Sequence, residues 1–147
     1  YHALNEVFVG RLVAGRVVEL AVRIDGHDLT HYTGDGVIVA TSTGSTAYAL
    51  SAGGPIVAPE VDCMLVVPVA AHTLARRAVV LSAECQVELA CPNERRAEAC
   101  VTIDGEQVPC GQPFERVKVW RGDRDVSLLK LDGTAFLDVV REKFLGA

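Results

Sequence analysis

The stretch RVVELAVRIDG, residues 16–26, alternates between apolar and polar side chains and ends at an Asp-Gly pair. Its apolar residues fall on one face of an extended chain and its charged residues on the other: Val18, Leu20, Val22 and Ile24 against Glu19, Arg23 and Asp25. A period of two is typical of a strand with one buried face, and Asp-Gly favours a tight hairpin turn. The stretch therefore predicts a half-buried strand in an antiparallel sheet.

Similar strand patterns follow along the rest of the chain. Short apolar or alternating segments occupy residues 36–41, 63–69, 78–82, 86–91, 100–105 and 115–122. The run GVIVAT at 36–41 is apolar throughout, which predicts a strand buried on both faces. Turn signals recur about every 8–12 residues, including one at 92–96, and this spacing is typical of an antiparallel β-sandwich.

Helical patterns are scarce. GSTAYALSAGG at 44–54 predicts one short internal helix of about two or three turns, with Gly44 or Ser45 near its N-cap and a double glycine to end it. The tail from residue 133 predicts a C-terminal amphipathic helix, with Phe136, Leu137, Val140 and Phe144 on one stripe. We therefore predict a mainly β, antiparallel β-sandwich-like domain with these two helices.

Composition narrows the class of protein. The chain has 147 residues, a hydrophobic fraction of 50% and a net charge of −5. This profile predicts a globular domain and argues against a broad nucleic-acid-binding face. No apolar run reaches the roughly 18 residues of a membrane-spanning helix, so we expect no membrane partner. The 5 cysteines are odd in number and form no Cys-x-x-Cys pair, which predicts thiols in a reducing cytoplasm and no metal site.

STGSTAYALSAGGP at 42–55 is the most unusual stretch for function. A buried strand runs into a glycine-containing turn and then a helix N-terminus, whose backbone N–H groups have no partners within the helix and attract anions or carbonyls. Thr46 and Ser51 add hydroxyl groups, and the ring of Tyr48 can lie against a base. The stretch lacks the lysine of a P-loop. It suits a phosphate, sugar or amide ligand, or an ordinary capped corner between a strand and a helix.

Two other polar pieces are candidates. Asn5 and Glu6 interrupt an apolar strand entry, and an adjacent amide and carboxylate can hold the two neighbouring hydroxyls of a ribose. The alternative is a solvated strand end. Asp35 lies between two glycines, where it either contacts a ligand or simply forms a turn. TIDGEQ at 102–107 predicts a hairpin turn near the ligand. Asp104 and Glu106 are either within reach of the ligand or simply residues of the turn.

Together these pieces resemble the carboxy-terminal domain of the NAD kinase family. The resemblance rests on LNE at 4–6, GDGVIVATSTGSTAYALSAGGPIV at 34–57 and VVPVAAHTLARRAVV at 66–80. The tail FLDVVREKF at 136–144 resembles the family's closing helix, which returns to pack on the amino-terminal domain. The resemblance implies a β-rich dinucleotide-binding domain at 1–125 and a C-terminal segment at 126–147 that packs on an absent amino-terminal domain.

The resemblance also implies an activity and a set of roles. The family transfers a phosphoryl group to the 2′-hydroxyl of the adenosine ribose of NAD, which gives NADP. The implied NAD-binding residues are Asn5 and Glu6 at the adenosine ribose, Thr46, Ala47 and Tyr48 in the nucleotide pocket, Asp35 and Ser51 toward the nicotinamide, and Arg16 as a weaker candidate. The implied phosphoryl donor is ATP or polyphosphate, with Mg²⁺ or another divalent metal.

In the family, the carboxylate that accepts the proton of the acceptor hydroxyl lies in a Gly-Gly-Asp-Gly motif of the amino-terminal domain, and this sequence contains no such motif. It also begins without methionine. We therefore expect a piece of a longer, cytoplasmic, oligomeric protein, with no catalytic residue of its own and no activity alone. Two alternatives stay open: the corresponding domain of a related lipid kinase, and a non-catalytic nucleotide-sensing or assembly module.

Overall fold

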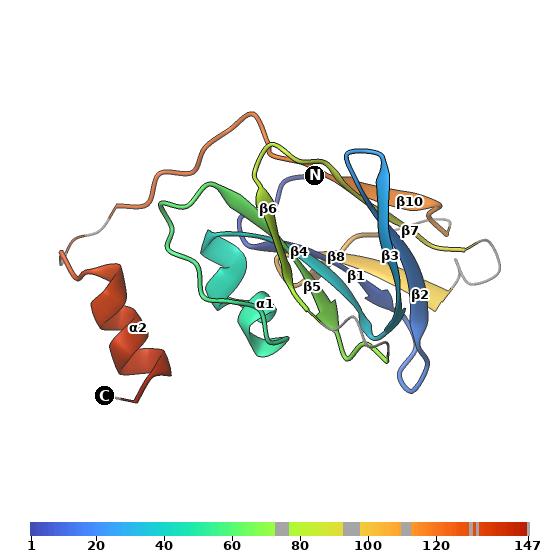
Figure 1. The fold of residues 1–147 in the computed structure, drawn as a ribbon, viewed down its shortest axis with the longest axis horizontal. Coiled ribbons are helices and arrows are strands. Elements are labelled where there is room, and N and C mark those ends of the chain that lie inside the picture. Colours follow the sequence, from blue (N-terminus) through green and yellow to red (C-terminus); the bar gives the residue numbers. More distant parts are fainter. Residues whose placement is uncertain (73–76, 93–97, 110–112, 130, 132, 147) are drawn as a thin grey trace.

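The computed structural model describes residues 1–72, 77–92, 98–109, 113–129, 131 and 133–146 (Figure 1). Its strands are β1 Glu6–Arg11, β2 Val18–Ile24, β3 His27–Gly34, β4 Gly36–Thr41, β5 Cys63–Val69, β6 Val79–Ser82, β7 Val87–Ala90, β8 Ala99–Ile103, β9 Glu106–Gln107 and β10 Arg116–Val119. Its helical segments are the 3₁₀ turn η1 Thr43–Thr46, α1 Tyr48–Ser51 and α2 Phe136–Phe144.

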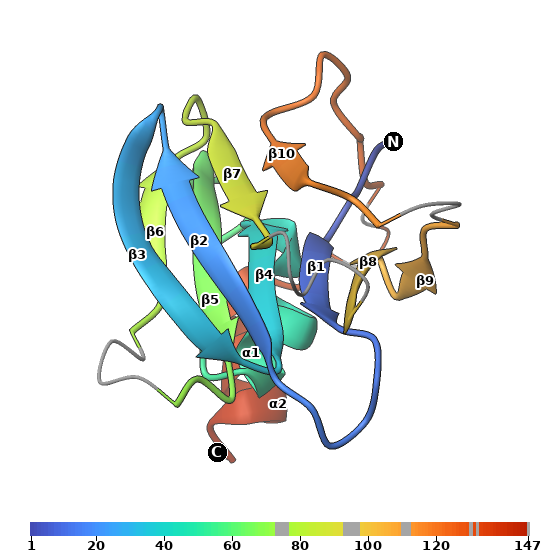
Figure 2. The same cartoon turned by 90° about the vertical axis from the view of Figure 1, so that its right-hand side faces the viewer.

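The strands form two sheets that lie face to face, as Figure 2 shows. The larger sheet has the order β6-β5-β4-β1-β8-β9, and the smaller one has the order β10-β7-β2-β3. Neighbouring strands pair antiparallel in both sheets. The prediction of a mainly β, antiparallel sandwich is confirmed.

Two-residue turns set the register of two hairpins. Asp25 and Gly26 have φ of 49° and 81° and join β2 to β3, while Asp104 and Gly105 have φ of 47° and 85° and join β8 to β9. Positive φ at both positions gives the turn a twist that matches the paired strands, and Asp-Gly tolerates it. Both turns occur where the sequence predicts them.

The main core fills the space between the sheets. Val18, Leu20 and Val22 of β2 are buried there against Val37 and Val39 of β4. The predicted apolar face of β2 is thus buried through Val22, whereas Ile24, beside the turn, is only half-buried.

A second core covers the outer face of the larger sheet. Ile38 and Ala40 of β4 and Leu65 of β5 are buried there with Ala49 of α1. Both faces of β4 are therefore buried, as the continuous apolar run predicts. This second core attaches η1 and α1 to the end of β4. It therefore places the hydroxyl-rich turn, residues 42–51, on the outer side of the larger sheet (Figure 1).

Some strands differ from the sequence pattern. β3 is not predicted, because His27, Asp28 and His31 give it a polar, exposed surface. Such a surface fits its place at the edge of the smaller sheet. The strand predicted at 115–122 is limited to β10, and Trp120 beyond it is 62% exposed. The predicted turn at 92–96 lies largely outside the described residues, and Cys110 lies wholly outside them.

The predicted internal helix is not continuous. η1 ends at Thr46, α1 begins at Tyr48, and Ala47 between them has φ −97° and ψ −130°, which is not helical. Ser45 is not an N-cap: it lies inside η1, is fully buried, and bonds to the backbone of Val57. Short hydroxyl side chains compete for backbone partners, which explains why the stretch forms two single turns.

The C-terminal helix α2 forms where the tail predicts it. A segment without described helix or strand runs from Trp120 to Ala135 and carries the chain to the side of α1 (Figure 1). Val140 of α2 is buried, but Leu137, predicted on the apolar stripe, is 74% exposed. Within the described residues, none of the helices is long and apolar enough to cross a membrane.

Candidate functional site

Glu6 is a buried carboxylate at the start of β1. Only 7% of the residue is exposed, and the backbone N–H of Tyr48 lies near enough to its carboxylate to act against a rise in its pKa. The second carboxylate oxygen, Oε2, is buried and has no hydrogen-bond partner in the described part of the chain. Burial, and then the nearby charge of Asp104, raise the pKa of Glu6 above its ordinary value. A buried acceptor that is open in this way suits a hydroxyl donor from a ligand.

Asp104 holds the backbone around Glu6. Its carboxylate accepts hydrogen bonds from the backbone N–H groups of Leu4 at 2.7 Å, Asn5 at 2.8 Å and Glu6 at 2.9 Å. Partial burial alone would raise the pKa of Asp104, but these three donors outweigh it and lower the pKa. Asp104 is therefore held as an anion beside the Asn5–Glu6 pair.

The hydroxyl-rich turn lies directly on Asn5. Thr41 donates from its backbone to the Asn5 carbonyl at 2.9 Å, and its hydroxyl donates to the Leu4 carbonyl at 2.8 Å. The same hydroxyl accepts from the Gly44 N–H at 3.0 Å. A side chain on Gly44 would overlap the Asn5 carbonyl oxygen. Residues 4–6 and the start of η1 therefore form one packed unit.

Tyr48 sits next to this unit. Its ring packs edge-on against Phe8, with ring centroids 5.5 Å apart, and the residue is 42% exposed. Ala47 donates its N–H to the Gly44 carbonyl at 2.9 Å, which closes η1. Thr46 and Ser51 are exposed on the same helical turns. The structure therefore brings Asn5, Glu6, Ala47 and Tyr48 together, with an exposed ring beside a buried carboxylate. These four residues are called the Glu6 cluster below.

Asp35 lies toward the other end of β1. β1 and β4 pair Glu6 with Ala40 and Gly10 with Gly36, so about 13 Å of strand separates the Glu6 level from the Asp35 level. Arg11 donates from Nε to Asp35 Oδ1 at 2.7 Å, and this bond raises the pKa of the Arg11 guanidinium. The predicted residues are thus split between the two ends of one strand.

Arg16 lies in the loop between β1 and β2. It donates to Glu98 Oε1 at 2.7 Å, and its side chain is 63% exposed. Its ion pair ties the β1–β2 loop to the chain just before β8. In this structure it lies with neither Glu6 nor Asp35.

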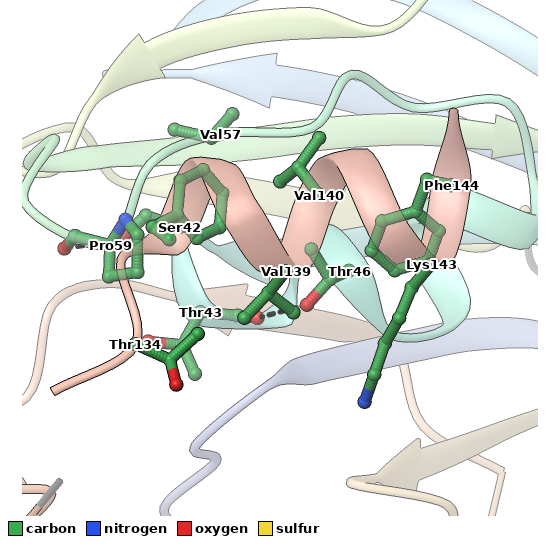
Figure 3. A pocket seen from close by; sticks show the side chains of 11 residues that line it. Ser42, Thr43, Thr46, Val57, Pro59, Thr134, Val139, Val140, Lys143 and Phe144 are labelled. Carbon is green, nitrogen blue, oxygen red and sulfur yellow. Dashed lines mark hydrogen bonds between the residues drawn. The ribbon is translucent and has the colours of Figure 1, made fainter. Parts of the chain in front are cut away.

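A hollow of about 470 Å³ opens between the hydroxyl-rich turn and α2 (Figure 3). Ser42, Thr43 and Thr46 line one side of it, and the α2 residues Val140, Lys143 and Phe144 are on the other side. Thr46 is the predicted site residue that lines it; Asn5, Glu6 and Tyr48 do not. The hollow therefore adjoins the Glu6 cluster through η1 but is a separate feature.

Two contributors to the site were missed or underestimated from the sequence. Arg11 was not singled out, and Asp104 was expected to form a turn within reach of a ligand, whereas it also holds residues 4–6. The only local signal for Asp104 is an Asp-Gly turn, which occurs again at Asp25. Among the described residues, no group of three or more His, Cys, Asp or Glu side chains is arranged to hold a metal ion.

Comparisons with known proteins agree with the sequence motifs. A family model for the ATP-NAD kinase C-terminal domain matches residues 4–131. The NAD kinase of Symbiobacterium thermophilum is 40% identical over 147 residues, which cover 98% of this chain and 50% of that protein. The chain spans about half the length of the curated relatives it matches.

Solved structures give the same result. A yeast NADH kinase complexed with NADH superimposes with a TM-score of 0.74 at 34% identity, covering 81% of this chain and 34% of the other. An NAD kinase from Archaeoglobus fulgidus in complex with ATP gives a TM-score of 0.73 at 32% identity, with coverages of 82% and 46%. The resemblance drawn from the motifs is confirmed.

Proposed function

Because this chain belongs to the NAD kinase family as its carboxy-terminal domain, we propose that it is the half that binds NAD for phosphorylation of the adenosine ribose 2′-hydroxyl to NADP. The observation that carries the proposal is the buried Glu6 carboxylate, whose Oε2 has no hydrogen-bond partner among the described residues. A ribose offers two neighbouring hydroxyl donors, and such a donor satisfies the open oxygen. The yeast neighbour was solved with NADH, which supports a dinucleotide as the ligand.

The other residues have roles that follow their positions. Asn5 joins Glu6 at the adenosine ribose, and Thr46, Ala47 and Tyr48 line the nucleotide pocket, where the exposed Tyr48 ring can stack on a base. Asp35 and Ser51 act toward the nicotinamide. A dinucleotide is an elongated ligand, and this length supports a site that extends along β1 from Glu6 to Asp35. Arg16 remains a weaker candidate, because it pairs with Glu98.

We further propose ATP or polyphosphate as the phosphoryl donor, together with Mg²⁺ or another divalent metal. The Archaeoglobus neighbour was solved with ATP. Mg²⁺ commonly binds through substrate phosphates and one or two carboxylates, and Glu6 offers one buried carboxylate oxygen that has no hydrogen-bond partner among the described residues. This chain's own part is to hold the acceptor ribose in place, since phosphoryl transfer depends mainly on alignment and charge neutralisation.

The proton acceptor belongs, in this proposal, to an amino-terminal domain that residues 126–147 contact. The described residues Val126, Leu128, Leu129, Leu131 and Leu137 are each at least 63% exposed, and so many exposed apolar side chains in one short segment support a covering domain. We therefore propose that the 147-residue chain has no NAD kinase activity alone.

Homo-oligomerisation and a cytoplasmic location complete the proposal. β3, β6, β9 and β10 stand at the edges of the two sheets, and unpaired edges favour association with another copy. Cys63 and Cys85 are thiols, and Cys63 is buried with a raised pKa. Unreactive thiols of this kind suit a reducing compartment.

The test uses the two-domain protein, in which this chain follows its amino-terminal half. NAD, ATP and Mg²⁺ are supplied, and NADP is followed with an NADP-specific dehydrogenase. We expect turnover in the wild type, a loss of about 100-fold or more in kcat/KM in Asn5→Ala, and a smaller loss in Asp35→Ala. Arg23→Ala, an exposed ion-pair variant of β2, is the control. A folded wild type that forms no NADP with either ATP or polyphosphate would contradict the proposal, and phosphorylation of a lipid instead would establish the related lipid kinase.

A further inference from the structure

Asp104 makes more polar contacts with the Asn5–Glu6 segment than any turn requires. Its carboxylate accepts from three successive backbone N–H groups, Oδ2 from Leu4 and Oδ1 from both Asn5 and Glu6. Its own N–H donates to the Glu6 carbonyl at 3.0 Å. Four hydrogen bonds therefore join two segments that lie about 100 residues apart in the sequence.

Turn geometry alone does not explain this residue. Asp104 has φ 47° and precedes Gly105, and Asp25 has φ 49° and precedes Gly26 in the other hairpin. Asparagine suits this backbone region as well as aspartate does. An ionised carboxylate, however, only accepts hydrogen bonds, whereas an asparagine amide would point N–H donors at one of the three N–H groups. The contacts with residues 4–6 therefore require the carboxylate.

These hydrogen bonds hold residues 4–6, the part of the candidate site with the closest packing. Glu6 is buried with Oε2 open, and Gly44 packs against Asn5 so closely that no side chain fits between them. Residues 4–6 cannot shift without disturbing η1. Asp104 is the group that bonds all three of their backbone N–H groups, and its charge also contributes to the raised pKa of Glu6.

We propose that Asp104 is a positioning residue, which fixes the backbone of residues 4–6 so that the Asn5 amide and the Glu6 carboxylate face the ribose hydroxyls together. The inference rests on the proposed function. Asp104 itself does not contact the ligand; it acts through the three N–H groups and through its charge beside Glu6.

The test compares Asp104→Asn with Asp25→Asn in the two-domain protein. The two variants are matched, because each keeps a residue suited to positive φ, and Asp25 also accepts a backbone N–H, from Gln86 at 2.8 Å. Calorimetry gives the NAD dissociation constant from about pH 4 to about pH 8, a range that begins below the ordinary pKa of a glutamate and extends above it. Hydrogen exchange with mass spectrometry follows the peptide that carries residues 4–6.

In Asp104→Asn we expect NAD to bind about tenfold more weakly, the size of one lost charge-assisted hydrogen bond. Exchange at residues 4–6 should accelerate. NAD needs ionised Glu6, so affinity rises with pH through the Glu6 pKa; removing the Asp104 charge should move this midpoint to lower pH. Asp25→Asn should stay within about twofold of the wild type in all three measurements.

Three outcomes would overturn the inference. Equal NAD affinity in Asp104→Asn and the wild type would contradict the inference alone and leave the proposed function standing. So would a weaker affinity with an unchanged pH midpoint and unchanged exchange at residues 4–6. A folded wild type that binds no NAD would contradict the proposed function, and the inference would fail with it.

Discussion

Arg11 and Asp35 form a two-point ion pair across the end of β1 and the β3–β4 turn. Arg11 Nε donates to Asp35 Oδ1 at 2.7 Å, and Nη2 donates to Oδ2 at 3.4 Å. The two side chains are 30% and 36% exposed. Asp35 is thus held in one orientation by a planar guanidinium, which a lysine cannot reproduce.

Replacing Arg11 should disturb Asp35 without touching the Glu6 cluster. We expect Arg11→Ala to raise the KM for NAD about fivefold, and Arg11→Lys to recover only part of the loss, because a single ammonium does not fix both oxygens. Steady-state kinetics on the two-domain protein measure this. Arg23→Ala is the matched control, since Arg23 Nε also lies 2.7 Å from a carboxylate, that of Asp28. A strong effect of Asp35→Ala with none from Arg11→Ala would show that Asp35 needs no such support.

Glu6 should lower stability at neutral pH. Its pKa is raised in the folded protein, so the folded state holds its proton more tightly than the unfolded state. Its contribution to stability is greatest below the ordinary pKa of 4.5 and is lost as pH rises through the raised value. At pH 7.5 we expect Glu6→Gln to have a free energy of unfolding about 1 kcal/mol higher than that of the wild type, measured by urea unfolding. Its affinity for NAD should fall.

Measuring the same stability difference at a second pH separates the effect of the Glu6 charge from other effects of the substitution. At pH 4 the difference between Glu6→Gln and the wild type should shrink, because Glu6 is then protonated in both states. Glu60→Gln, at an exposed position, should show no difference at either pH. A Glu6→Gln protein that is less stable than the wild type at pH 7.5 would contradict an ionised, unsatisfied Glu6.

Gly44 should tolerate no side chain. A Cβ at this position would overlap the Asn5 carbonyl oxygen and lie 2.8 Å from the Asn5 Cα, which is backbone and cannot rotate away. We expect Gly44→Ala to cost about 1–3 kcal/mol of stability and to weaken NAD binding, since Asn5 must move. Urea unfolding and calorimetry measure the two effects. Gly122→Ala is the control, because its Cβ would meet nothing nearer than the His2 ring at 3.7 Å. If Gly44→Ala binds NAD with wild-type affinity, Asn5 is not part of the NAD site.

Ser45 should stabilise the turn through one buried hydroxyl. Its Oγ accepts from the Val57 N–H at 3.0 Å and donates to the Val57 carbonyl at 3.2 Å, in a residue with no exposed surface. Ser45→Ala leaves both backbone groups without this partner, so we expect a loss of about 1–3 kcal/mol. Ser82→Ala removes a similar acceptor from the Glu84 N–H at an exposed site and should cost less than about 0.5 kcal/mol. Equal losses in the two variants would show that burial of Ser45 does not matter.

Much of the fold could be predicted from local pattern. The alternation of β2, the apolar run of β4 and both Asp-Gly turns depend on neighbours in the sequence, and all were found. β3 was missed because an edge strand can carry polar residues on its exposed surface. The helix at 44–54 was predicted as one piece, because the tertiary contacts that divide it, Gly44 on Asn5 and Ser45 on Val57, come from residues far from the turn.

The sequence by itself determined the family, the sandwich and the identity of Asn5, Glu6 and Tyr48 as candidates, because motifs and periodicity are local properties. Only the tertiary structure decided how these residues work together. It buried Glu6 with one open oxygen, tied residues 4–6 to Asp104, and placed Arg11 on Asp35. Each of these contacts joins segments that are 24 to 100 residues apart, and such pairing depends on sheet order and register, which a single sequence does not reveal.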